Sequence, residues 1–205
     1  MSILQQVIQL NNGGVTCLTA PLSPQAQAEA FDSFKAALTI LSRACVDPTV
    51  TQPGAAMASP LLNISIQDTP CFASVRAERR AFYMTSEETD NSYEAFTASS
   101  AVVMFNMALG LHCRGTMLKN SALLARASYL YEHCLQLLRV VAQRFEGAQV
   151  LTAATLKNLA DVHAQNGDYP ALRCVLDSLI LMDVRGIIWQ EEQVSCGQEK
   201  SASAA

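Results

Sequence analysis

Apolar residues recur along most of this chain with the spacing of helix faces. Three triplets follow the same rule, in which the second residue comes four positions after the first and the third comes three later. That spacing places all members of a triplet on one side of an α-helix. We therefore predict an all-α fold in which each triplet lines a packed helix face. The triplets are Ala30/Phe34/Ala37, Ala127/Tyr131/Cys134 and Leu172/Leu176/Leu179.

Capping residues predict where the helices begin and end. After a first helix over about residues 3–19, Ser23 followed by Pro24 has the chemistry of a helix start, and this second helix should run to about residue 44. Asn91 and Glu94 have capping-box spacing and predict a helix that ends near Gly115. Further signals indicate the limits of the later helices: Gly147, Gly167 and Gly186 as ends, and Asp168 as a cap before Pro170.

The middle of the chain departs from the helical pattern. Residues 47–90 contain a cluster of prolines, which is typical of a linker or insertion. Within it Leu62, Ile64 and Ile66 alternate with polar residues, and residues 81–84 are rich in aromatic side chains. We expect one or two short strands or extended arms there.

A second pattern relates the helices to one another. Three segments, Leu10–Gly14, Met104–Ala108 and Leu156–Ala160, each open with a large apolar residue and reach a small residue four positions later. Together with the triplets, this resembles the tetratricopeptide repeat, a helix–turn–helix unit that stacks into a solenoid. The third copy is the most similar, because Leu172 follows Leu156 at the family's spacing and Gly167-Asp168-Tyr169 falls at the family's turn. The other copies have longer turns, so the repeats are divergent.

The resemblance implies a tetratricopeptide-like α-solenoid of about three helix pairs, with a Pro-rich insertion that holds short extended segments. The expected divisions are a first helix pair (residues 1–46), an insertion or linker (47–90), a second pair (91–146), a third pair (147–185), and a short cap with a disordered tail (186–205).

Asparagine recurs at one position of the repeat, two residues after the opening apolar residue, as Asn12, Asn106 and Asn158. In the family this position faces a concave groove. A primary amide both donates and accepts hydrogen bonds, so it can pair with the main chain of an extended peptide of any sequence. We expect a non-catalytic adaptor that binds a protein or peptide partner in this groove. The candidate peptide-binding residues are Asn12, Asn106, Asn158, Phe105, Leu109 and Lys157.

Two alternatives stay open for the asparagines and for the groove. The asparagines also fit ordinary hydrogen bonding on helix surfaces or between helices. The groove also fits an occupant from the chain's own insertion, residues 47–90, or from a second copy in a homodimer. In that case the protein is a structural or self-assembling module.

Composition and charge narrow the function classes. The chain has 50% hydrophobic residues, a net charge of -4 and no excess of basic residues, which argues against a nucleic-acid binder. Residues 95–113 carry no charge and are long enough to span a membrane, but Thr97, Asn106 and His112 interrupt the stretch. A central helix of a stack explains it better, so we expect no membrane partner.

The seven cysteines are scattered and include no Cys-x-x-Cys pair. This favours reduced thiols, and with no basic leader near the N-terminus we expect a cytoplasmic protein. The pairs His112-Cys113 and His133-Cys134 lack the short ligand spacings of a zinc site. The sequence offers no nucleophile motif and no phosphate-binding loop, so we expect no enzyme activity, no metal and no cofactor.

Overall fold

The computed structural model describes residues 1–20, 23–46, 64–70, 80–86 and 92–184, and the elements named below lie within these ranges. The helices are α1 (Ile3–Thr19), α2 (Pro24–Val46), α3 (Tyr93–Leu118), α4 (Ser121–Val141), α5 (Ala148–Asn166) and α6 (Tyr169–Val184), and the strands are β1 (Ile64–Pro70) and β2 (Arg80–Ser86). The prediction of a mostly helical fold is confirmed. So is the prediction of short extended segments inside the insertion.

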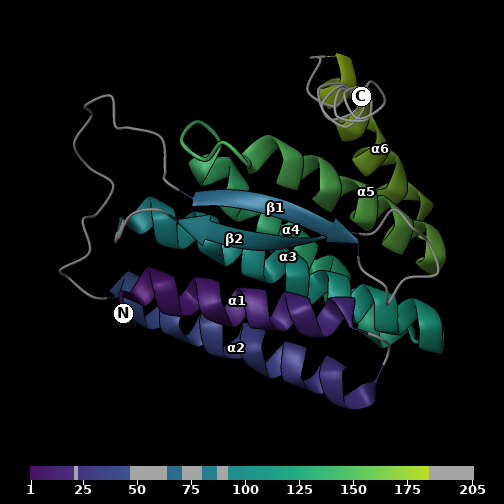
Figure 1. Cartoon of the computed structure of the whole chain (residues 1–205). Coiled ribbons are helices and arrows are strands. Elements are labelled where there is room, and N and C mark those ends of the chain that lie inside the picture. Colours follow the sequence, from purple (N-terminus) through teal and green to yellow (C-terminus); the bar gives the residue numbers. More distant parts are fainter. Residues whose placement is uncertain (21–22, 47–63, 71–79, 87–91, 185–205) are drawn as a thin grey trace, which may run out of the picture.

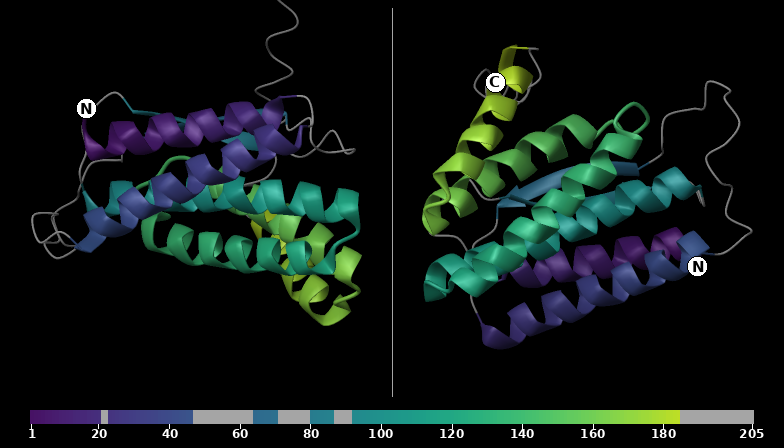
Figure 2. Two further views of the ribbon diagram at one scale, coloured as in Figure 1. Left: turned by 90° about the horizontal axis from the view of Figure 1, so that it is seen from below. Right: turned by 180° about the vertical axis from the view of Figure 1, so that it is seen from behind.

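The helices pack in consecutive pairs, α1 with α2, α3 with α4 and α5 with α6 (Figure 1). The second helix of each of the first two pairs also packs on the next pair, so that α2 contacts α3 and α4 contacts α5. The first helices α1, α3 and α5 are neighbours in the same order. Figure 2 shows this succession of pairs from below and from behind. The β-hairpin lies against α1 and α3, on the side formed by the first helices.

Two predicted caps are confirmed by their hydrogen bonds. The Ser23 hydroxyl accepts a bond from the Ala26 N–H at 2.9 Å, just before Pro24 opens α2. The Asp168 carboxylate accepts one from the Ala171 N–H at 3.2 Å. Gly167 ends α5 with a φ of +70°, a conformation that side chains with a Cβ disfavour. The local sequence therefore determines these boundaries.

Two predicted boundaries were wrong in position, and a third was correct to within three residues. Ser92 caps α3, with its hydroxyl accepting from the Ala95 N–H at 3.1 Å, whereas Asn91 lies outside the described residues. The predicted end near Gly115 is three residues short of the observed one, and Gly115 itself lies where α3 and α4 are close: a Cβ there would lie 2.9 Å from Leu124 Cδ2. Helix α3 continues to Leu118. Gly147 is the N-cap of α5 and does not end α4, and Gly186 lies outside the described residues.

Small residues bring the paired helices close together. A Cβ at Gly14 would lie 2.5 Å from the Phe34 ring, so only glycine permits this approach of α1 to α2. The first two triplets are buried throughout, Ala30/Phe34/Ala37 on α2 and Ala127/Tyr131/Cys134 on α4. The third triplet differs: Leu176 is 44% exposed, and Leu172 and Leu179 are only partly buried.

Helix α3 is the centre of the fold. It is the one described helix whose length and apolar content would suffice to cross a membrane, and 83% of its apolar 18-residue window is buried. This burial explains its apolar residues, because a helix packed on several sides needs no polar face.

The two strands form an antiparallel hairpin in which Asp68 pairs with Phe82 and Ile66 with Met84. Of β2, the side chains of Ala81, Phe82 and Met84 are buried, while Thr85 is exposed. A two-stranded hairpin is marginally stable in water by itself. The hairpin here depends on the helices beneath it.

Candidate functional site

Three asparagines of the helices bind the main chain of β2. Helix α1 supplies Asn11 and Asn12, and α3 supplies Asn106. We call these three residues the amide clamp. The side chains of Asn11 and Asn106 are fully buried, and a buried amide is costly unless its hydrogen bonds are satisfied. The clamp satisfies them with partners on the strand.

Two members of the clamp each bind both main-chain groups of one β2 residue. The Asn106 oxygen Oδ1 accepts from the Phe82 N–H at 2.9 Å, and its Nδ2 donates to the Phe82 carbonyl at 2.8 Å. Asn12 does the same for Met84, with 2.8 Å for both bonds. A planar amide thus reproduces the donor and acceptor of a neighbouring β-strand.

Asn11 connects these two contacts. Its Nδ2 lies 3.0 Å from the Phe82 carbonyl and 3.1 Å from Asn12 Oδ1, and its own Oδ1 accepts from Asn106 Nδ2 at 2.9 Å. The amide groups therefore form one network across α1 and α3. Buried polar networks of this kind are stabilising when every member has its partners.

The strand register explains why the clamp reaches Phe82 and Met84. In an antiparallel pair, the main-chain groups of alternate residues point toward the partner strand and those of the others point away. The main-chain N–H and carbonyl groups of Phe82 and Met84 point to the asparagines. The main-chain groups of Ala81 and Tyr83 therefore point to β1. The clamp covers the edge of β2 that β1 does not.

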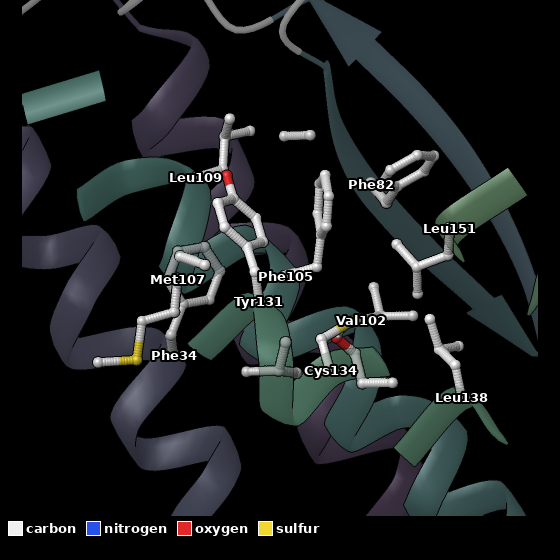
Figure 3. Close-up of a cluster of buried hydrophobic side chains, with 14 of the residues drawn as sticks. Phe34, Phe82, Val102, Phe105, Met107, Leu109, Tyr131, Cys134, Leu138 and Leu151 are labelled. Atoms are coloured by element: carbon white, nitrogen blue, oxygen red, sulfur yellow. Dashed lines mark hydrogen bonds between the residues drawn. The ribbon is translucent and has the colours of Figure 1, made fainter. Parts of the chain in front are cut away.

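Aromatic contacts anchor the same strand. The Phe82 ring lies edge-on to Phe105 with centroids 5.1 Å apart, and Phe105 lies 5.7 Å from Tyr131. Figure 3 shows Phe105 between these two rings. Phe105, Phe82 and Met84 are all buried. The strand is held by its main chain and by apolar side chains at the same residues.

The predicted site residues are brought together in part. Asn12, Asn106 and Phe105 meet at β2, although the extended segment that they contact is the chain's own. Leu109 is completely buried in the cluster of Figure 3, so its side chain is closed to an external peptide. Lys157 is exposed on α5. Asn158 is half-buried and forms no side-chain hydrogen bond within the described part of the chain.

Asn11 is not among the candidate peptide-binding residues predicted from the sequence, and Phe82 and Met84 were not identified as occupants of the groove. The adjacent pair Asn11-Asn12 was the one available signal, because two amides in succession are unusual in a buried helix face. Nothing local identifies their partners, which lie 71 and 72 residues further along the chain.

A second polar cluster links α3 to α5. His112 Nε2 lies 3.4 Å from the Asp161 carboxylate and 3.3 Å from Gln165 Nε2, and the Thr116 hydroxyl donates to Gln165 Oε1 at 2.9 Å. A histidine beside a carboxylate can act as a general base, but it must reach its substrate. The side chain of His112 is 0% exposed, so this histidine does not reach solvent, and the cluster joins two helices.

The cysteines of the described residues form no disulfide, and the most deeply buried one is Cys134. Burial raises the pKa of the Cys134 thiol to about 12, and the thiol donates to the Ala101 carbonyl at 3.3 Å. Burial also raises the pKa of Cys17 and of Cys45. Since the thiolate is the reactive form, these environments do not activate a nucleophile. The described residues include no group of three or more metal-binding side chains.

No protein-family model matches this chain, and no curated protein or solved structure matches it either.

Proposed function

We propose that the chain is a non-catalytic, tetratricopeptide-like interaction module whose groove over α1 and α3 is filled by its own β-hairpin. The order of helix contacts supports the repeat relationship. Each pair packs internally, each second helix packs on the following first helix, and the first helices line one side. That is the arrangement expected of stacked helix–turn–helix units.

The observation that carries the proposal is the double hydrogen bonding of Phe82 by Asn106 and of Met84 by Asn12. A groove that recognises an extended peptide through its main chain would use these contacts, as in strand addition at a sheet edge. Here the insertion supplies the extended segment. The hairpin is then a built-in ligand, and the groove over α1 and α3 is closed to other peptides while the hairpin is bound.

Burial of the hairpin side chains indicates how firmly it is held. Phe82 is 3% exposed and Met84 0%. Fully burying a large apolar side chain contributes about 1.5–3 kcal/mol for each residue. The hairpin is therefore part of the folded core, which favours a structural role for the groove over that of a permanently open adaptor.

An adaptor role uses the surface that the hairpin leaves open. Lys157 is exposed on α5, and the Asn158 amide has no hydrogen-bond partner among the described residues. These two residues are the predicted peptide-binding positions that remain for an external protein partner. We propose that a partner that binds while the hairpin occupies the groove contacts α5.

The experiment weakens the binding of the hairpin by a substitution and then adds the hairpin sequence as a separate peptide. Phe82→Ala removes the main aromatic anchor, and a synthetic peptide covering residues 62–88 is then added. We expect the peptide to raise the melting temperature of Phe82→Ala toward that of the wild type, because a ligand that binds only the folded state stabilises it. The wild type, with its groove occupied, should not respond.

Two controls make the result specific. Thr85→Ala changes an exposed residue of the same strand and should behave like the wild type. In the double variant Phe82→Ala/Asn106→Ala, the peptide should give no rescue because the clamp is incomplete. Equal binding of the peptide to the wild type and to Phe82→Ala would show that the groove is open and would overturn the proposal.

A further inference from the structure

The last helix, α6, has an apolar side that no described element covers. Helix α6 packs mainly on α5, and among its described residues only Val175 is buried. Beside this contact lie Tyr169, Leu176 and Ile180, which are 71%, 44% and 59% exposed. Their spacing of seven and four residues puts them on one stripe of the helix. We call these three residues the α6 stripe.

The equivalent helices show what such a face normally contacts. Helices α2 and α4 are the second helices of their pairs, and each is followed in space by a further element that packs on it, α3 and α5, respectively. Their apolar triplets are buried as a result. In α6 the corresponding triplet includes Leu176, which is part of the exposed stripe. The stacking pattern thus lacks one element at this end of the described chain.

We infer that the chain's own segment Ile187–Trp189 packs on the part of the α6 stripe formed by Leu176 and Ile180. These residues lie outside the described part of the structure, which ends at Val184. The segment Ile187-Ile188-Trp189 is a run of three large apolar residues and contains the only tryptophan of the protein. It is followed by a polar stretch, so it is the apolar part of the tail.

The distances along the chain fit this placement. Ile180 and Leu176 lie four and eight residues before the end of α6, which corresponds to about 6 and 12 Å along the helix axis. Five residues separate Val184 from Trp189 inclusive, and an extended chain of that length spans roughly 17 Å. A chain that reverses direction after Val184 therefore reaches both residues.

Tethering favours the tail over a second molecule as the occupant. The exposed Arg173 and Asp177 both lie within one turn of Leu176, so the charges described beside the stripe balance and do not select an occupant. The tail is covalently attached next to the stripe, which gives it a high effective concentration that a second copy lacks.

Trp189 makes the inference directly testable, because all tryptophan fluorescence of the protein comes from this residue. For the native full-length chain we expect an emission maximum shifted to the blue of the denatured protein, and protection from acrylamide quenching. Ile180→Glu should move the emission to the position of the denatured chain and remove the protection. Circular dichroism verifies that the variant is folded, which we expect because the position is largely exposed.

A matched control is Val140→Glu, which introduces the same charge at a residue of α4 with 60% exposure. It should leave the emission unchanged. The inference is overturned if native Trp189 emits like the denatured chain, if Ile180→Glu leaves a blue-shifted emission in place, or if the blue shift disappears on dilution. The last result would assign the stripe to a second copy of the chain.

Discussion

Asn106 and Asn158 occupy the same position of the predicted repeat but have different surroundings. Asn106 on α3 is completely buried and binds both main-chain groups of Phe82. Asn158 on α5 is half-buried and has no side-chain hydrogen bond within the described residues. The difference follows the position of β2, which packs against α1 and α3. The strand beside Asn106 therefore accounts for the difference between these two asparagines.

The largest effect should come from removing the anchor of the bound strand. Phe82→Ala deletes a ring that contacts Phe105 at a residue that is only 3% exposed, and replacements of this kind cost about 3–5 kcal/mol of unfolding free energy. Urea denaturation measures this loss. Tyr83→Ala, at the half-buried neighbour, should cost clearly less; equal losses would show that Phe82 is not the anchor.

Asn106→Ala should come next. The substitution removes the partner of the Phe82 N–H and of Asn11 Oδ1 in a buried site, while the Phe82 carbonyl keeps its bond from Asn11 Nδ2. Each unsatisfied buried group costs about 1–3 kcal/mol. We expect a loss of about 2–4 kcal/mol in unfolding free energy from the same denaturation experiment. A loss as small as that of Asn158→Ala would mean that the two positions are equivalent and that the clamp is not formed.

Asn12→Ala should have an intermediate effect. Asn12 also holds a strand residue through paired bonds, but its side chain is only half-buried, so water can replace part of what is lost. We expect a loss of about 1–2 kcal/mol, measured by urea denaturation. A loss larger than that of Asn106→Ala would contradict the ranking by burial.

Asn158→Ala should have the smallest effect. With no hydrogen bond to remove among the described residues, the change should stay within about 0.5 kcal/mol of the wild type. The measurement is again urea denaturation, with Lys157→Ala at the exposed neighbouring position as the matched control. A loss above that range would show that Asn158 has a structural partner of its own.

Features set by neighbouring residues could be predicted from the sequence. The caps Ser23 and Asp168 and the αL glycine Gly167 act within three residues of their own position. Their chemistry is visible locally. The start of α3 was misplaced because Asn91 and Ser92 are both good capping residues, and only the hydrogen bond to Ala95 distinguishes Ser92.

The helix residues of the candidate site could be predicted from the sequence, but the strand residues that they bind could not. The repeat position of Asn12 and Asn106 marked them as amides that could bind an extended main chain, and the insertion was one of the expected occupants. Which strand residues they bind could not be predicted, because the choice depends on packing between segments far apart in the sequence. Asn106 and Phe82 are 24 residues apart, and Asn11 and Phe82 are 71 apart.

Amide hydrogen exchange of β2, followed residue by residue by NMR, tests the central claim most directly. The N–H groups of Phe82 and Met84 point away from β1 and are covered by Asn106 and Asn12. We predict that both are protected in the wild type, and that Asn106→Ala removes protection at Phe82 before it affects Ala81 and Tyr83. Rapid exchange of Phe82 and Met84 in the wild type, beside protected Ala81 and Tyr83, would contradict the clamp and leave the groove open.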